Sequence, residues 1–76
     1  MIHFASLVAQ WECAEDTAFQ AECRVEQAAD EYCSAQGPAP DPADVARTRR
    51  LRFVAGHRLR WLLYQVRKAQ AGARLI

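Results

Sequence analysis

The sequence predicts an all-α protein built as one antiparallel two-helix hairpin, and three observations support this fold class. All three prolines of the 76-residue chain lie in the segment GPAPDP, at 37–42. Apolar residues recur at helical spacing on both sides of it. Neither side contains a second cluster of turn residues. We expect one domain, 1–76, with a helix over about 2–36, a loop at about 37–41 and a helix over about 42–72.

Each expected helix has a heptad repeat of apolar residues. Counted from Phe4 as position a, the first helix has apolar residues at ten successive a and d positions. In the second helix, only Thr48 and Arg52 interrupt the same pattern. Such a stripe is typical of helices that pack along each other in a coiled-coil-like seam. The expected seam residues are Phe4, Leu7, Trp11, Ala14, Ala18, Ala21, Val25, Ala28, Tyr32, Ala55, Leu59, Leu62, Val66 and Ala69.

One antiparallel register brings a large residue opposite a small one in most layers, as a close-packed core prefers. The expected layers pair Phe4 with Ile76, Leu7 with Ala73, Trp11 with Ala69, Ala14 with Val66, Ala18 with Leu62, Ala21 with Leu59 and Val25 with Ala55. Arg52 would then lie opposite Ala28 and extend its guanidinium into water.

The loop residues predict how each helix ends and begins. Gly37 suits the left-handed position just past a helix. Asp41 is a favourable N-cap, and Pro42 is tolerated at the first helical position. Asp44 adds a carboxylate to the first turn of the second helix.

The composition predicts an ordered chain, and the odd number of cysteines without a secretory leader predicts a location in the reducing cytoplasm. Hydrophobic residues make up 51% and charged residues 25% of the chain. An apolar run of the roughly 18 to 20 residues needed to span a membrane is missing, so we expect no membrane insertion. Met1 to Trp11 lacks the charged start of a secretory leader. The three cysteines, Cys13, Cys23 and Cys33, lie about 15 Å apart along a helix, too far for a disulfide or a shared metal site.

Charge divides between the two helices. Residues 1–36 carry seven acidic residues against Arg24 alone, and residues 43–76 carry nine basic residues against Asp44 alone. Such asymmetry predicts either pairing between the helices or a charged partner. Five arginines are candidate anion contacts: Arg47, Arg49, Arg50, Arg60 and Arg67. They keep open a homodimeric hairpin that binds RNA or DNA through its second helix.

The second helix has a further apolar stripe, nearly opposite the seam. A helix that is apolar on two faces is normally buried on two faces. The stripe therefore predicts a protein partner, either a second hairpin that completes a four-helix bundle or a groove in another protein. The expected partner-binding residues are Phe53, Val54, His57, Trp61, Leu63, Tyr64 and Lys68.

Catalytic motifs are not recognisable in the sequence. His3 and His57 fall on different helices, and the chain has no glycine-rich phosphate loop. A helical hairpin also offers no obvious concave pocket. We therefore expect a protein that is not an enzyme and that has no catalytic, cofactor-binding or metal-binding residues.

The layout of two long helices, a glycine, a linker that ends in Asp-Pro and a Leu-Leu-Tyr run near the end resembles one known family. It is similar to the small helical-hairpin co-chaperones of bacterial type III secretion systems, the YscE/SsaE type. The matching positions are Leu7, Val25, Ala28, Tyr32, Gly37, Asp41, Pro42, Leu51, Ala55, Leu62, Leu63 and Tyr64.

This resemblance implies a non-enzymatic cytoplasmic protein that pairs with a helical-repeat chaperone. The pair would keep a secreted subunit, such as the needle protein, soluble before export. A purely self-associating structural bundle is a further alternative, and the sequence leaves the identity of the partner and the oligomeric state open.

Overall fold

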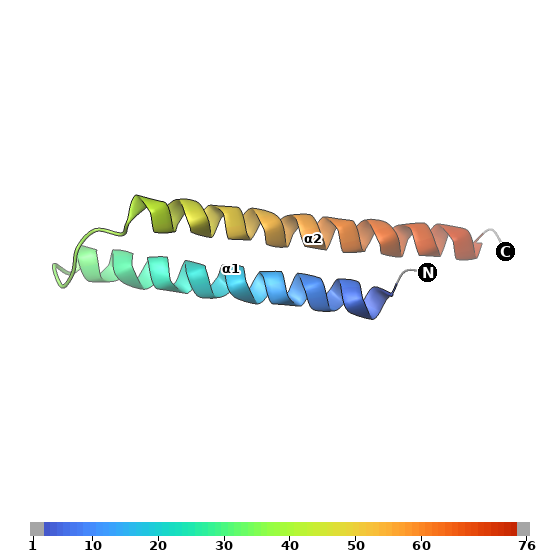
Figure 1. Ribbon diagram of the computed structural model, residues 1–76, viewed down its shortest axis with the longest axis horizontal. Coiled ribbons are helices and arrows are strands. Elements are labelled where there is room, and N and C mark those ends of the chain that lie inside the picture. Colours follow the sequence, from blue (N-terminus) through green and yellow to red (C-terminus); the bar gives the residue numbers. More distant parts are fainter. Residues whose placement is uncertain (1–2, 75–76) are drawn as a thin grey trace.

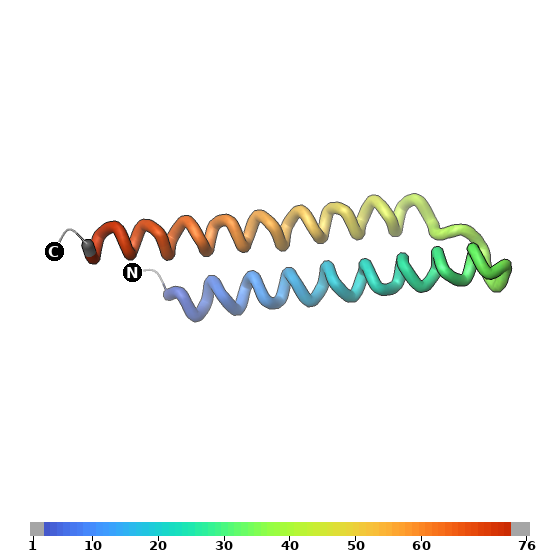
Figure 2. The backbone as a smooth tube through the Cα atoms, turned by 180° about the vertical axis from the view of Figure 1, so that it is seen from behind, coloured from blue at the N-terminus to red at the C-terminus, as the bar shows by residue number. Residues whose placement is uncertain are grey.

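The computed structural model describes residues 3–74, which form two long antiparallel helices, α1 (Phe4–Cys33) and α2 (Pro42–Arg74). Figure 1 shows the helices side by side with their connection at one end, and Figure 2 shows the same pairing from behind. The hairpin is elongated, with extents of 63, 18 and 15 Å. This arrangement confirms the predicted all-α hairpin.

The first helix ends in a Schellman turn. The amide of Gln36 donates to the carbonyl of Glu31 at 2.8 Å, and the amide of Ala35 donates to the carbonyl of Tyr32 at 3.1 Å. These two bonds define the motif, which places one residue in the left-handed region. That residue is Ala35, whose φ is 57°.

Two sequence-based expectations are therefore wrong at this end. The helix ends at Cys33 rather than near residue 36, and the left-handed position belongs to Ala35 instead of Gly37. The apolar repeat continues through Ala35, so periodicity does not mark the turn. After the turn the chain runs back beside α1, where Pro40 lines a recess together with Val25 and Ala28.

The second helix begins as predicted. Asp41 accepts a hydrogen bond at Oδ1 from the amide of Ala43 at 2.9 Å, and its carbonyl accepts from the amide of Val45 at 3.1 Å. Pro42 is the first helical residue. Asp41 is thus the N-cap of α2, and its side chain satisfies an amide that has no partner within the helix.

The buried side of each helix follows the heptad a and d positions. Ala18, Ala21, Ala55 and Leu62 are buried, and Gln65 is buried beside them. Most other residues of the expected seam are half-buried: Leu7, Trp11, Ala14, Val25, Ala28, Leu59 and Val66. The core is therefore narrow and consists mainly of alanine.

Three expected seam residues are exposed instead: Phe4, Tyr32 and Ala69. The cause is a different register. Arg52, expected opposite Ala28, binds Glu15 and Glu22. Relative to the expected register, α2 is displaced by roughly one heptad or more toward the beginning of α1, a shift that can keep a and d positions facing each other.

The returning loop explains this displacement. Because residues 34–41 fold back beside α1, the second helix begins alongside the last turns of the first. Its own last turns then extend past the beginning of α1 (Figure 1), so Ala69 is left exposed. The expected contact between Phe4 and Ile76 lies outside the described residues.

A single hairpin leaves much of its surface in water. Its accessible surface is 6170 Å², whereas a globular protein of this mass exposes about 4,700 Å². Its radius of gyration is 17.8 Å, against about 11 Å for a compact domain of this length. The excess of about 1,500 Å² is comparable to the area that one subunit contributes to a large protein interface.

Candidate protein-interaction surface

One side of the hairpin is closed by an ion-pair network around Arg52. Its Nε and Nη2 donate to the two carboxylate oxygens of Glu22 at 3.1 and 2.6 Å, and its Nη1 donates to Glu15 at 2.6 Å. All three side chains are about 40% exposed. Hydrogen bonding to Arg52 holds the pKa of Glu22 below its ordinary value, and the two carboxylates raise the pKa of Arg52. We call this side the ion-pair face.

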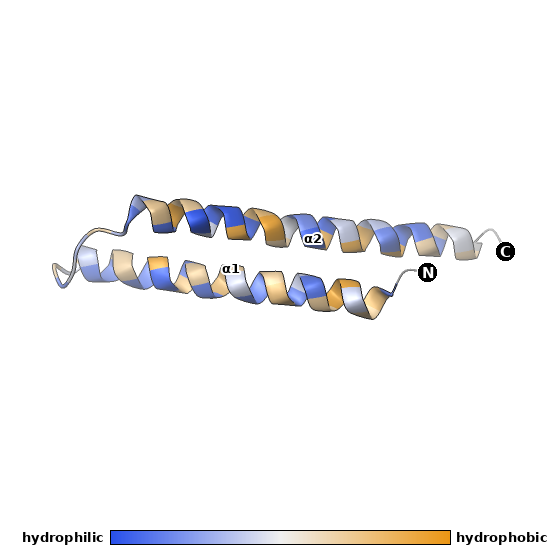
Figure 3. Cartoon of the chain, viewed as in Figure 1, coloured by the Kyte–Doolittle hydropathy of each residue, from blue (hydrophilic) through white to orange (hydrophobic). Residues whose placement is uncertain are grey.

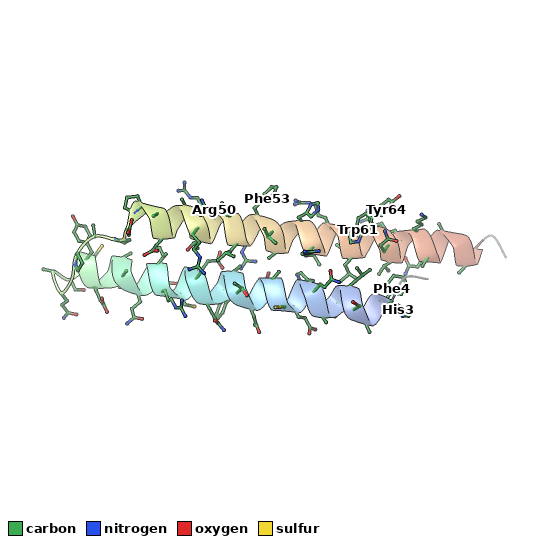
Figure 4. The ribbon with its side chains drawn as sticks, viewed as in Figure 1. His3, Phe4, Arg50, Phe53, Trp61 and Tyr64 are labelled. Atoms are coloured by element: carbon green, nitrogen blue, oxygen red, sulfur yellow. The ribbon has the colours of Figure 1, made fainter. Side chains whose placement is uncertain are left out.

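The predicted partner-binding residues of α2 are all exposed. We call the row Val54, His57, Trp61, Tyr64 and Lys68 the outer stripe. The rings of Trp61 and Tyr64 stack with centroids 5.8 Å apart and planes 25° apart. Figure 3 shows hydrophobic residues scattered among hydrophilic ones along α2, and Figure 4 shows Tyr64 directed away from α1.

These residues do not share a single direction around α2. Val54 and Trp61 line recesses between the two helices. Phe53, which is 69% exposed, points away from α1 in Figure 4 and lines none of those recesses. Helical geometry places Phe53 and Leu63 toward the ion-pair face, about 100° or more around the axis from Val54 and Trp61. The predicted partner-binding residues therefore belong to two distinct surfaces, one with Val54 and Trp61 and the other with Phe53 and Leu63.

The side opposite the ion-pair face carries three recesses between the helices, and we call it the groove face. One recess lies between Val54 and Arg58 of α2 and Ser6, Cys13 and Ala14 of α1. A second, toward the open end, has Trp61 opposite Ser6 and Leu7. The third lies toward the loop, where Asp44 and Arg47 face Arg24 and Ala28.

The first helix has no acidic residue on the groove face from residue 3 to residue 30. Its c and g positions over this span are His3, Ser6, Gln10, Cys13, Thr17, Gln20, Arg24 and Gln27. The six acidic residues of the same span occupy b, e and f positions. Depletion of charge is typical of the centre of a protein interface. The sequence analysis missed this surface, although sorting the acidic residues by heptad position would have revealed it.

Two buried side-chain polar atoms in the described part of the chain have no hydrogen-bond partner. They are Nε1 of Trp11, a donor, and Oε1 of Gln65, an acceptor. Gln65 is only 5% exposed and lines the same recess as Trp61. Unpaired buried groups destabilise a fold, so the isolated hairpin is not optimally packed at its open end.

The candidate anion-binding arginines do not form a common cradle. Arg47, Arg49, Arg50, Arg60 and Arg67 are all exposed. Arg47 lines the recess near the loop, whereas Arg50 points outward from α2 in Figure 4. Helical geometry spreads the five around the axis. Within residues 3–73, the arginines that form ion pairs or cross-helix hydrogen bonds are Arg52 and Arg58.

Residues suited to metal binding do not gather in the described part of the chain. No group of three or more His, Cys, Asp or Glu residues lies close enough together there to hold an ion. The three cysteines are free and exposed. His3 lies at the beginning of α1 and His57 in the middle of α2. Neither of the two helices in the described residues 3–74 has the hydropathy of a membrane-spanning segment.

Comparison of the chain with protein-family models, with curated proteins and with solved structures found no match in any of the three.

Proposed function

We propose that the chain is a non-enzymatic interaction module that docks through the outer side of α2 onto a helical protein. The observation that supports this proposal is the row of large apolar side chains that the fold leaves in water. Tyr64 and Phe53 are 55% and 69% exposed and line none of the recesses between the helices. Aromatic residues of this kind are enriched among the residues that dominate binding energy.

The energetics of the hairpin agree with a docking role. Its buried core is mostly alanine, and alanine burial contributes little free energy. A chain of this size with so small a core gains much of its stability from a bound partner, because binding to the folded form alone favours folding by mass action. An apolar helical row fits a groove between the helices of another protein.

A finer proposal rests on the family resemblance. In it, the partner is a helical-repeat chaperone of a type III secretion system, and the hairpin acts in the cytoplasm as a co-chaperone. The support for it is the layout of the two helices around the Asp-Pro linker, with Asp41 as the N-cap of α2.

Nucleic-acid binding is a second candidate, favoured by the exposure of Arg49, Arg50, Arg60 and Arg67 on α2. Contacts of arginine with phosphate weaken steeply as salt rises. A complex held by apolar side chains changes little over the same range. Salt dependence therefore distinguishes the two candidates.

The test is co-purification from the native cell with wild-type bait and with matched variants. A Phe53→Glu/Tyr64→Glu bait should lose a stoichiometric helical partner, whereas a Phe19→Glu bait should retain it, because Phe19 is similarly exposed but lies on α1. An Arg49→Gln/Arg50→Gln bait should also retain the partner at about 0.5 M salt, where surface electrostatics are screened. Loss of binding only in the arginine variant, or recovery of nucleic acid without protein, would refute the docking proposal.

A further inference from the structure

We infer that the groove face is closed by a second copy of this chain, which gives a symmetric four-helix bundle. This inference goes beyond the proposed function, because the second copy would cover Val54 and Trp61 and leave Phe53 and Tyr64 free for another protein. It rests on area, on shape and on the distribution of charge.

The area agrees with a stable dimer. Each hairpin exposes about 1,500 Å² more than a globular chain of its mass. If two copies removed that excess from each other, they would bury about 3,000 Å² in total, which is typical of obligate homodimers. The long face that would supply this contact measures 63 by 18 Å in outline.

The shapes on the groove face are self-complementary in one arrangement. A two-fold axis parallel to the helices keeps every residue at its own level along the bundle and places α2 of one copy over α1 of the other. Within one hairpin, Val54 lies at the level of Cys13, and Trp61 at the level of Ser6. In the dimer, Val54 and Trp61 would therefore face small residues of the second copy, the large-against-small packing that cores require.

Charge favours the same arrangement. Because the c and g positions of α1 carry no acidic residue before Glu31, residues 3–20 present an uncharged surface to Trp61 and Val54 of the second copy. Near the loop, Arg24, Asp44 and Arg47 line one recess, and in the dimer Asp44 of one copy would lie between the arginines and approach Arg24 of the other copy as an opposite charge. A dimer with the loops at opposite ends would instead stack α2 on α2, which would bring Arg58 near its own copy and Arg47 near Lys68 of the second copy, like charges whose approach is unfavourable.

The three cysteines provide a test that needs no mutation. Cys13 lines a recess of the groove face, whereas heptad position f places Cys23 on the outer side of α1. Both thiols are exposed in the single hairpin. In the wild-type dimer, a thiol reagent should modify Cys13 at least tenfold more slowly than Cys23, and dilution to monomer should bring the two rates together. Equal rates in the dimer would refute the inference.

Oligomeric state provides the second test. At about 100 µM, well above a micromolar Kd, light scattering after gel filtration should give twice the chain mass of 8.6 kDa. Trp61→Glu and Val54→Glu should each raise the dimer Kd at least tenfold. Phe53→Glu is the matched control, because Phe53 is more exposed than either residue but points away from the groove face, and it should leave the Kd unchanged.

A monomer at this concentration, or a dimer that survives both groove-face variants, would overturn the inference. Neither outcome bears on the proposed docking of another protein, which is lost with Phe53 and Tyr64. Conversely, if the protein is a dimer but no protein partner co-purifies with it from the cell, the proposed function is refuted and the inferred dimer is not affected.

Discussion

Arg52 binds Glu22 side-on, with Nε and Nη2 donating to the two oxygens of one carboxylate at 3.1 and 2.6 Å. The same guanidinium reaches Glu15 with its remaining terminal nitrogen. One residue of α2 thus joins two residues of α1 that are one heptad apart, and a planar guanidinium suits this geometry better than an ammonium group.

This ion pair predicts how stability depends on pH. Because the pKa of Glu22 in the folded chain is below the ordinary value of 4.5, its stabilising effect is complete above about pH 4.5. It is lost as the pH falls through the lower value of the folded state. The melting temperature of Glu22→Gln should therefore lie below that of wild type at pH 7, and the difference should shrink toward pH 3.

The control for this pH series is Glu26→Gln, since Glu26 is exposed and makes no ion pair among the described residues. Its melting temperature should follow that of wild type at every pH. An equal difference between Glu22→Gln and wild type at pH 7 and pH 3 would contradict the role given to the carboxylate.

The left-handed turn residue predicts a stabilising substitution. Ala35 has a φ of 57°, a conformation that disfavours a residue with a Cβ by about 1 kcal/mol. Ala35→Gly should therefore raise the free energy of unfolding by several tenths to about 1 kcal/mol, measured by urea denaturation.

Gly37 is the matched position for that experiment. Its φ is not positive, and an added Cβ would meet Glu31 at an ordinary contact distance of 3.5 Å. Gly37→Ala should stabilise the fold by about 0.4 to 1 kcal/mol, because alanine lowers the conformational entropy of the unfolded chain. If Ala35→Gly destabilised the protein while Gly37→Ala stabilised it, the Schellman turn would lie elsewhere.

The N-cap of α2 predicts a loss. Asp41→Ala removes the acceptor of the Ala43 amide, and we expect it to lower the free energy of unfolding by about 1 kcal/mol. Asp41→Asn keeps an acceptor oxygen and should restore most of that loss. Equal stability of the two variants in thermal melts would show that the cap does not contribute.

The register predicts opposite responses from two alanines of α2. Ala55 is completely buried, so Ala55→Leu should destabilise the hairpin by about 1 to 3 kcal/mol through overpacking. Ala69 is exposed, so Ala69→Leu should change the stability by less than about 0.5 kcal/mol. A large effect at Ala69 as well as at Ala55 would favour the register in which Ala69 faces Trp11 and Ala55 faces Val25.

The heptad repeat was enough to predict the fold class and the buried stripe around Ala18, Ala55 and Leu62. It was not enough to predict the register, because an alanine stripe offers similar layers after a shift of a heptad. The turn at Ala35 also escaped prediction, since alanine rarely adopts a positive φ and Gly37 stood two residues away. Such local geometry depends on where the returning loop packs.

The candidate site was predictable only in part. Exposure of Trp61 and Tyr64 followed from their positions opposite the seam. The division between Val54 and Phe53 did not, because it depends on which side of the hairpin the Arg52 network occupies. Glu15 and Glu22 lie at e positions and Arg52 lies at an a position. The heptad repeat alone does not predict that these residues pair.

A seam of alanines specifies the axial position of one helix relative to the other only weakly. Bulky interlocking side chains would fix one setting by shape, but Ala18, Ala21 and Ala55 pass one another with little resistance. Arg52 then fixes the register, since it binds two carboxylates one heptad apart and can bind both at only one axial position of α2. A variant without the Arg52 guanidinium should still form a hairpin, but one in which α2 samples neighbouring registers along α1.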